Sequence, residues 1–260
     1  MSEVFIIDAI RTPIGSFLGQ YKKTESVDLG SLCVEGIFSR NKNLNKKHVE
    51  GLILGQVLTA GLGMNTARQV LLKSKLSQNS FAYCVNQVCG SGMRAVMETA
   101  LKIKSNENQL LVAGGQESMS LARHTSLQRV TTKLGHEMMI DSILSEGLTD
   151  VFSKDHMGIT AENVARRYKV TRLEQDEFAF HSYKKAYIAL KKNYFKNELI
   201  SGSLVDEVRQ GTKLEKLSSL KAVFKNNGTV TAGNASSLND GASMLLIGSS
   251  KYCDSNKIKP

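Results

Sequence analysis

The chain has 260 residues, of which 41% are hydrophobic and 22% are charged, and its formal net charge is +10. Apolar residues spread over the whole length and only 2 prolines exclude a long disordered tract. The longest apolar runs have strand length and fall well short of the roughly 20 residues that a membrane-spanning helix needs. The first residues carry an early acid and no basic stretch, which predicts a strand and not a signal peptide. We therefore expect a cytoplasmic protein with no membrane partner.

The composition also bears on metals, disulfides and nucleic acids. The cysteines at positions 33, 84, 89 and 253 have no CxxC spacing and no paired histidines, so we expect no metal site and reduced thiols. The basic residues are dispersed through helical and loop sequence without a nucleic-acid-binding signature. A lysine-rich solvated surface explains the charge better than a nucleic-acid partner, and a small phosphate-bearing ligand also fits it.

The first 115 residues alternate short apolar runs with amphipathic stretches, which predicts an α/β fold with a parallel sheet covered by helices. The predicted strands are residues 4–9, 51–55, 81–85 and 109–113, and the predicted helices between them are residues 29–39, 65–73 and 91–104. Asp28 is the predicted N-cap of the first helix. Three strand and helix pairs followed by a strand predict a doubly wound layer.

The pattern changes from residue 116 to about residue 225, where helices and long polar connections dominate. The clearest helices there are residues 160–168 and 172–193. Strand character returns at residues 229–232 and 242–247, so the sheet is expected to resume there. We predict one domain of residues 1–115 and 228–260, interrupted by an inserted loop domain of residues 116–227.

One cysteine stands between a predicted strand and a predicted helix, in the run NQVCGSGMRA. Small neighbours permit a tight turn, and the free amides and positive dipole end of a helix N-terminus stabilise a thiolate. Cys89 is therefore a candidate nucleophile, although spacing alone more often marks a buried structural thiol. A cysteine hydrolase also uses a cysteine in this setting, but the sequence does not single out its His and Asn partners.

The segment VNQVCGSGMRAV resembles the segment around the acyl-accepting cysteine of thiolases. Five further segments resemble thiolase segments in the family's order: RTPIGSFLGQ, GQVLTAGLGMNTARQVLL, AGGQESMS, DHMGITAENVA and GTVTAGNASSLNDGAS. The resemblance covers essentially the whole chain. It implies the layered α/β thiolase fold, a parallel-rich sheet covered by helices with an inserted domain that binds coenzyme A (CoA).

The resemblance implies an acyltransferase that carries an acetyl group as a thioester on Cys89 and condenses it reversibly with a second acetyl-CoA to acetoacetyl-CoA. CoA is then substrate and product, and no separate cofactor is implied. His156 and Met157 match a pair that lines the pantetheine end of the CoA site in the acetoacetyl-CoA-forming branch. The other implied CoA-binding residues are Arg209 at the nucleotide end, Ser236 at the pantetheine chain, and Phe224 and Ala232 near adenine and pantetheine.

The chain departs from the family in what it lacks. Thiolases have a second half with an Asn-Glu-Ala-Phe segment, a Gly-His-Pro segment with the activating base, and a Cys-x-Gly-Gly-Gly segment with a proton-transferring cysteine. None of these occurs here, so we expect very poor turnover of the chain alone and exposed apolar surface on the sheet face that would pack on the second half. Lys216 and a shortened stretch at residues 198–208 also depart from the family near the nucleotide end.

Three functions stay open at this stage. The first is an acetyl-CoA C-acetyltransferase completed by a second half, and the others are a 3-ketoacyl-CoA thiolase of fatty-acid degradation and a non-catalytic remnant that binds CoA. The pair of His156 and Met157 and the QVLTAG segment favour the first. The family also implies a homo-oligomer, a dimer or a tetramer, if a C-terminal half completes the protein.

Overall fold

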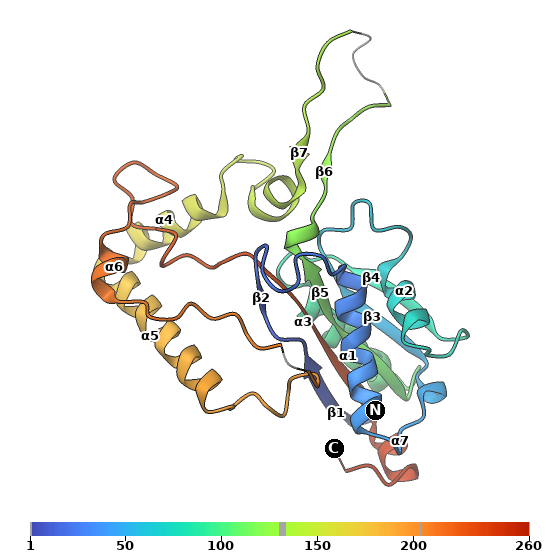
Figure 1. Ribbon diagram of the computed structural model, residues 1–260. Helices are drawn as coiled ribbons and strands as arrows, with labels where there is room; N and C mark the ends of the chain where they lie inside the picture. The colour runs from blue at the N-terminus through green and yellow to red at the C-terminus, as the bar shows by residue number, and fades with distance from the viewer. Residues whose placement is uncertain (1, 130–133, 203, 260) are drawn as a thin grey trace. The chain divides into compact units, whose positions relative to one another are not determined.

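The computed structural model describes residues 2–129, 134–202 and 204–259 (Figure 1). It divides into two compact units. The first comprises Met1–Ala122, Asn197–Leu204 and Asn239–Pro260, and the second comprises Arg123–Lys196 and Val205–Leu238. Residues 228–238, which the sequence analysis assigned to the sheet domain, cluster with the second unit, whereas residues 197–204 cluster with the first.

The first unit is built on a mixed sheet with the strand order β1, β8, β5, β3, β4 (Figure 1). Its strands are β1 (Val4–Arg11), β2 (Gly15–Ser16), β3 (Gly51–Gly55), β4 (Phe81–Val85), β5 (Leu110–Ser118) and β8 (Asn239–Ser249). β3 pairs in parallel with β4 and β5, whereas β8 lies antiparallel between β5 and β1 and also pairs with β2. The predicted parallel-rich α/β layer is confirmed, and β5 and β8 are longer than their apolar runs indicate.

Helices cover both faces of this sheet. They are α1 (Ser26–Arg40), α2 (Thr66–Lys73), α3 (Ser91–Lys104) and the terminal α7 (Ser250–Ser255), with short 3-10 turns at Lys46–His48 and Met119–Leu121. Side chains alternate along β5: Leu110 and Val112 pack in the core with α1 and α2, whereas Leu111 and Ala113 pack with Ile103 of α3. The three predicted helices of this unit are confirmed.

The predicted cap of α1 is wrong. The helix begins at Ser26, and the N-cap position belongs to Glu25, whose backbone is extended. Asp28 lies instead in the first turn, where its negative charge suits the positive end of the helix dipole. The amphipathic period located the helix but not its first residue. Ser26 and Val27 are both buried, so the helix begins with residues that pack in the core and not at the acidic side chain of Asp28.

One face of α3 is apolar and exposed. Met93, Met97 and Leu101 are spaced four residues apart and are 70%, 51% and 60% exposed. A contiguous apolar stripe of this kind marks a surface for contact with another segment or chain.

The second unit is mainly helical. Its elements are the two-stranded hairpin β6 (His124–Thr125) and β7 (Ile140–Asp141), the π-helical turn Ile143–Leu148, and the helices α4 (Met157–Tyr168), α5 (Arg172–Lys191) and α6 (Leu214–Ser218). α5 starts with a capping box in which Thr171 and Glu174 exchange hydrogen bonds. The predicted strand at residues 229–232 is wrong, because these residues form turns with a single bridge between Ala222 and Thr231.

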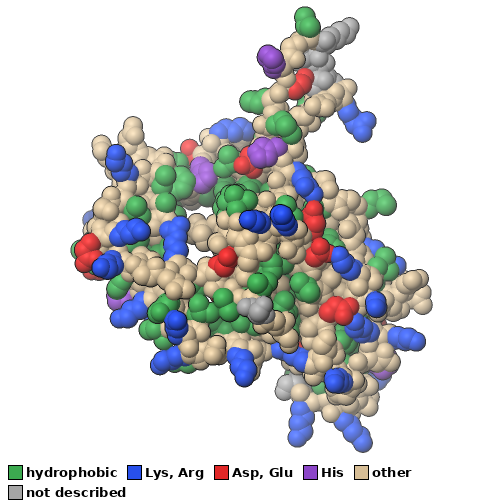
Figure 2. Space-filling model, in the orientation of Figure 1, with side chains coloured by type: hydrophobic (Ala, Val, Ile, Leu, Met, Phe, Trp, Pro, Cys, Tyr) green, Lys and Arg blue, Asp and Glu red, His purple; other side chains and the backbone are tan. Residues whose placement is uncertain are grey.

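The surface agrees with the dispersed charge seen in the sequence. Figure 2 shows Lys and Arg side chains scattered over the visible face and not gathered into one stripe. Within the described ranges, no helix is long and apolar enough to cross a membrane.

Candidate active site

Cys89 lies in the turn between β4 and α3, two residues before the helix begins at Ser91. Its side chain is exposed, so it is not the buried structural thiol that its spacing alone also allows. Cys33 and Cys253 are buried, and burial raises the pKa of Cys33 to about 12 and that of Cys253 in the same direction. Both groups are therefore held as neutral thiols. Cys84 is half-buried and its sulfur accepts a hydrogen bond from the Ala67 N–H at 3.3 Å, so Cys89 is the one exposed thiol among the four cysteines, all of which the structure describes.

The turn that carries Cys89 has a fixed and unusual backbone. The Gln87 N–H donates to Ser91 Oγ at 2.9 Å, the Ser91 hydroxyl donates to the Val88 carbonyl, and the Gly90 N–H donates to the Gln87 carbonyl at 3.1 Å. Val88 has φ = 50°, which is rare for a β-branched residue. Strain of this kind persists where the surroundings impose it, and it occurs at functional sites. No described residue accepts a hydrogen bond from the Cys89 N–H, so this donor is available to a ligand.

Two glycines of the sheet lie beneath the first turn of α3. A Cβ on Gly55, at the end of β3, would lie 2.4 Å from the Gly92 nitrogen and from the Ser91 carbonyl carbon. A Cβ on Gly115 of β5 would lie 3.4 Å from the Gly92 Cα. The helix start is therefore seated directly on two parallel strands, at the last residue of β3 and at Gly115 within β5, an approach that only glycine at position 55 allows. This seating fixes the position of Cys89.

A carboxyl group that the sequence analysis did not single out lies on the same unit. Glu117 of β5 accepts hydrogen bonds from the Val57 N–H at 2.9 Å and the Leu58 N–H at 3.2 Å. Burial raises the pKa of Glu117 to about 7, and the two backbone hydrogen bonds oppose this rise. The sequence signal is an acid at the end of a buried strand, which by itself does not distinguish a titrating group from a loop anchor.

The second unit contains a cavity of about 800 Å³ with largely apolar walls. Four of the residues implied by the resemblance line it together: His156, Met157, Phe224 and Ser236. The first two start α4, and the other two come from the turns after α6. A concave, mostly apolar site with few polar groups is typical of a small-molecule site.

His156 and Phe224 form a stacked pair in this cavity. Their ring centroids are 4.7 Å apart and the rings are inclined by 18°. The His156 Nδ1 accepts a hydrogen bond from the Gly158 N–H at 3.0 Å, so the neutral imidazole carries its proton on Nε2. A Cβ on Gly158 would lie 2.2 Å from the Phe224 ring, which explains why the stack needs glycine there.

The other two implied residues lie beside the cavity and not in its lining. Arg209 Nη1 donates to the Ala232 carbonyl at 3.1 Å, so these two residues contact each other. Asn234, Ala235 and Gln175 line the cavity and were not identified from the sequence. Asn234 and Ala235 stand in the NASS segment, whose match to the family was the available signal, whereas Gln175 carried none. Among the described residues, no group of three or more His, Cys, Asp or Glu side chains forms a metal site.

The family model for the thiolase N-terminal domain matches residues 4–251. The chain is 41% identical to a probable acetyl-CoA acyltransferase of Staphylococcus aureus, over the whole chain and 69% of the relative, and 41% identical to an acetyl-CoA acetyltransferase of Paracoccus denitrificans, over 95% of the chain and 66% of the relative. Solved structures agree. The Acat5 thiolase of Ascaris suum in complex with coenzyme A has a TM-score of 0.94 and 34% identity. The match covers 99% of this chain and 69% of the Ascaris chain.

The acetyl-CoA acetyltransferase of Bacillus anthracis has a TM-score of 0.95 and 33% identity, over 100% of this chain and 68% of its own. The chain thus spans about two thirds of the length of these relatives. The family match extends over nearly the whole chain, and the fold agrees over the same range. This chain therefore belongs to the thiolase family and corresponds to the N-terminal domain of that family.

Proposed function

We propose that this chain carries the acyl-accepting cysteine and the CoA-binding part of an acetyl-CoA C-acetyltransferase. The observation that carries the proposal is the exposed Cys89 in the strained turn before α3. The names of its relatives and the coenzyme A bound to the Ascaris thiolase support it. We further propose a cytoplasmic homo-oligomer, a dimer or a tetramer, with acyl-CoA as the small-molecule partner.

In the proposed first step, the Cys89 thiolate attacks the thioester carbonyl carbon of acetyl-CoA. A carbon–sulfur bond forms to Cys89, negative charge develops on the carbonyl oxygen, and the bond to the CoA sulfur then breaks. The CoA thiolate leaves and takes up a proton. The available Cys89 N–H is a suitable donor to the developing oxyanion.

In the proposed second step, the carbanion of a second acetyl-CoA attacks the acetyl thioester and Cys89 is released as the thiolate. This step needs a base for the methyl proton, and the first step needs a base for the thiol. We propose that the part of the relatives that this chain does not span supplies both. The chain alone is therefore expected to be acylated slowly, because the base for the thiol is missing, and not to turn over efficiently.

The cavity of the second unit is the proposed site of the pantetheine arm. Its apolar walls suit the arm's carbon chain, and the His156 Nε2–H and the Ser236 hydroxyl suit its amide and hydroxyl groups. Arg209 is the proposed partner of the nucleotide phosphates, with Ala232 beside it. The inserted domain, residues 116–227 with the adjoining turns, is thus the proposed CoA-binding domain.

The test is the intact mass of the purified chain after incubation with acetyl-CoA, the acyl donor of the proposed first step, followed by peptide mapping. One acetyl increment on Cys89 is expected. Cys89→Ala is expected to abolish the adduct and to leave CoA binding, measured by calorimetry, largely intact. Cys84→Ser is the matched control, because this thiol is half-buried and its variant should still be acetylated. Equal acylation of Cys89→Ala would contradict the role of Cys89.

A second candidate function is CoA binding without catalysis. It is favoured by the cavity, whose lining residues all belong to the second unit and so do not include Cys89. A folded chain that binds CoA but gains no acetyl group would support this alternative. A 3-ketoacyl-CoA thiolase of fatty-acid degradation would instead be acylated by a long-chain acyl-CoA as fast as by acetyl-CoA.

A further inference from the structure

One wall of the cavity has no helix or strand to hold it. We call residues 229–236 the wall segment, and Val230, Asn234, Ala235 and Ser236 of this segment line the cavity. Its backbone runs through turns with a single bridge at Thr231. The position of this wall must therefore depend on side chains from other elements, because an ordered backbone needs partners for its polar groups.

Glu162 of α4 holds the start of the wall segment. Its carboxylate accepts the Thr229 and Val230 N–H groups, both at 2.7 Å, and the Thr229 hydroxyl at 3.0 Å. Burial acts to raise the pKa of Glu162, but the hydrogen bonds from Val230 and Thr229 outweigh it and lower the pKa. The charged carboxylate is therefore the form that anchors this end.

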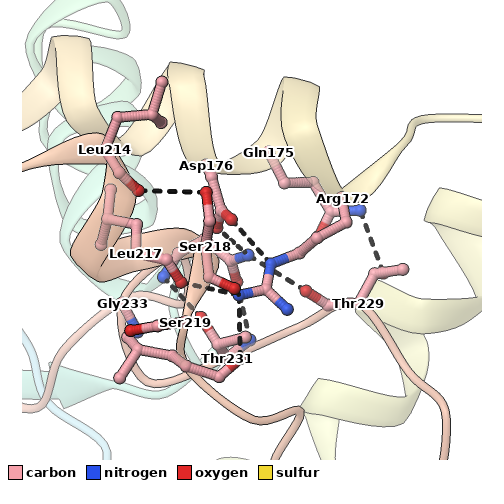
Figure 3. A network of polar contacts seen from close by, with 12 residues as sticks. Arg172, Gln175, Asp176, Leu214, Leu217, Ser218, Ser219, Thr229, Thr231 and Gly233 are labelled. Carbon is pink, nitrogen blue, oxygen red and sulfur yellow. Dashed lines mark hydrogen bonds and ion pairs between the residues drawn. The ribbon is translucent and has the colours of Figure 1, made fainter.

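Asp176 of α5 holds the other end through a buried network (Figure 3). The side chain is fully buried, and its two oxygens have different partners: Oδ2 accepts the Arg172 Nε–H at 2.7 Å and Oδ1 accepts the Asn234 Nδ2–H at 2.9 Å. Asn234 in turn donates to the Thr229 carbonyl and accepts the Thr231 N–H at 2.8 Å. Through one hydrogen bond, Asp176 thus reaches a residue that lines the cavity.

Arg172 compensates the buried charge and joins a second segment to the network. Its Nη2 donates to the Leu217 carbonyl at 2.7 Å and the Leu220 carbonyl at 2.9 Å, at the end of α6. A buried carboxylate is tolerated when it is paired and its oxygens are hydrogen-bonded, as here. The Asp176 carboxylate and Arg172 therefore link α5 by hydrogen bonds to both the end of α6 and the wall segment.

We propose that Asp176 is a positioning residue for the ligand in this cavity. It touches no ligand, but it fixes the amide of Asn234 and with it the course of the wall segment up to Ser236. The inference rests on the proposed function, because it takes CoA as the ligand of the cavity. It goes beyond that function in assigning part of the affinity to a buried side chain that does not line the site.

Asp176→Asn is the sharpest perturbation, because it preserves the shape. Both partners of Asp176 are donors, and a carboxamide offers only one acceptor oxygen, so either Arg172 or Asn234 then faces an N–H group. A buried donor left without an acceptor costs on the order of one tenfold step in an equilibrium constant. We expect CoA binding to the full chain, measured by titration calorimetry at 10 °C, to weaken roughly tenfold.

Glu177→Gln is the matched control. Glu177 is the next residue of α5 and is exposed. The Glu177→Gln variant loses the same charge as Asp176→Asn but leaves the network unchanged, so its affinity for CoA should equal that of the unmodified chain. Amide exchange of the wall segment should also be faster in Asp176→Asn. A merely structural role would lower the melting temperature and leave the affinity of the folded protein unchanged, which would overturn the proposal.

Tyr183→Phe tests the same wall if Asp176→Asn does not fold. The Tyr183 hydroxyl donates to the Gly233 carbonyl at 2.9 Å, and Tyr183 does not line the cavity. We expect about threefold weaker CoA binding, and unchanged binding in this variant would overturn the proposal. Failure of the unmodified chain to bind CoA would instead contradict the proposed function, so the two failures are distinguishable.

Discussion

The seating of α3 on the sheet can be tested by adding one methyl group. In Gly55→Ala the new Cβ would lie 2.4 Å from the Gly92 nitrogen and from the Ser91 carbonyl carbon, where ordinary contacts begin at 3.4 Å. Relief requires a shift of about 1 Å, the difference between these two distances. Both contacted atoms are backbone, so a side-chain rotation cannot provide the shift, and the first turn of α3 must move.

Overpacking of this size costs about 2 kcal/mol of the free energy of unfolding. With a urea dependence of about 2 kcal/mol per molar, the midpoint of urea unfolding should fall by about 1 M. The same shift displaces Cys89, and a misplacement of about 1 Å can slow a reaction about 100-fold. We therefore expect acetylation of Cys89 by acetyl-CoA to slow by between about tenfold and about 100-fold.

Gly92→Ala is the control in the same turn. Its Cβ would meet nothing closer than 3.9 Å, and alanine is the better helix former by about 0.5 to 1 kcal/mol. Its unfolding midpoint should be equal to or higher than that of the unmodified chain. An unchanged midpoint in Gly55→Ala would refute the tight seating of α3.

Two further predictions concern titrating groups. Because burial raises the pKa of Cys33 to about 12, about 1 in 10,000 of these thiols is ionised at pH 8, and iodoacetamide should label Cys89 while Cys33 stays unlabelled in peptide maps of the folded chain. Because the pKa of Glu117 is raised to about 7, the folded chain binds more protons than the unfolded chain between about pH 4.5 and 7. The free energy of unfolding, measured by urea unfolding, should therefore fall as the pH rises through this window. Glu117→Gln should flatten this pH dependence. A free energy of unfolding that rises between pH 5 and 7, or an equal pH dependence in the variant, would contradict the prediction.

The local elements of the first unit were predictable because their signals are local. The strands β3 and β4 and the helix α3 have the bounds that their apolar runs and flanking turns predict. The turn with Cys89 was predictable for the same reason, since small residues between a strand and a helix define it. The antiparallel position of β8 was not, because pairing between Val4 and Ser249 has no local signature.

The wall segment shows why the rest of the site could not be predicted from the sequence. Residues 229–232 have β-branched character, but Glu162 and Asn234 provide the partners that a neighbouring strand would otherwise provide. Asp176 and Asn234 are 58 positions apart, and Glu162 and Thr229 are 67 apart. A single sequence does not reveal pairs at such separations, so the polar network behind the cavity emerged only from the structure.

The place of β8 in the sheet also sets the order in which the chain can fold during synthesis. β1 and β5 each have β8 as a neighbour, and β8 follows all the other described strands in the sequence. At about 5 to 20 residues per second, β1 waits roughly 12 to 50 s for its partner while the whole helical unit is being translated. Until then the edges of β1 and β5 that later pair with β8 are open to pairing with strands of other chains.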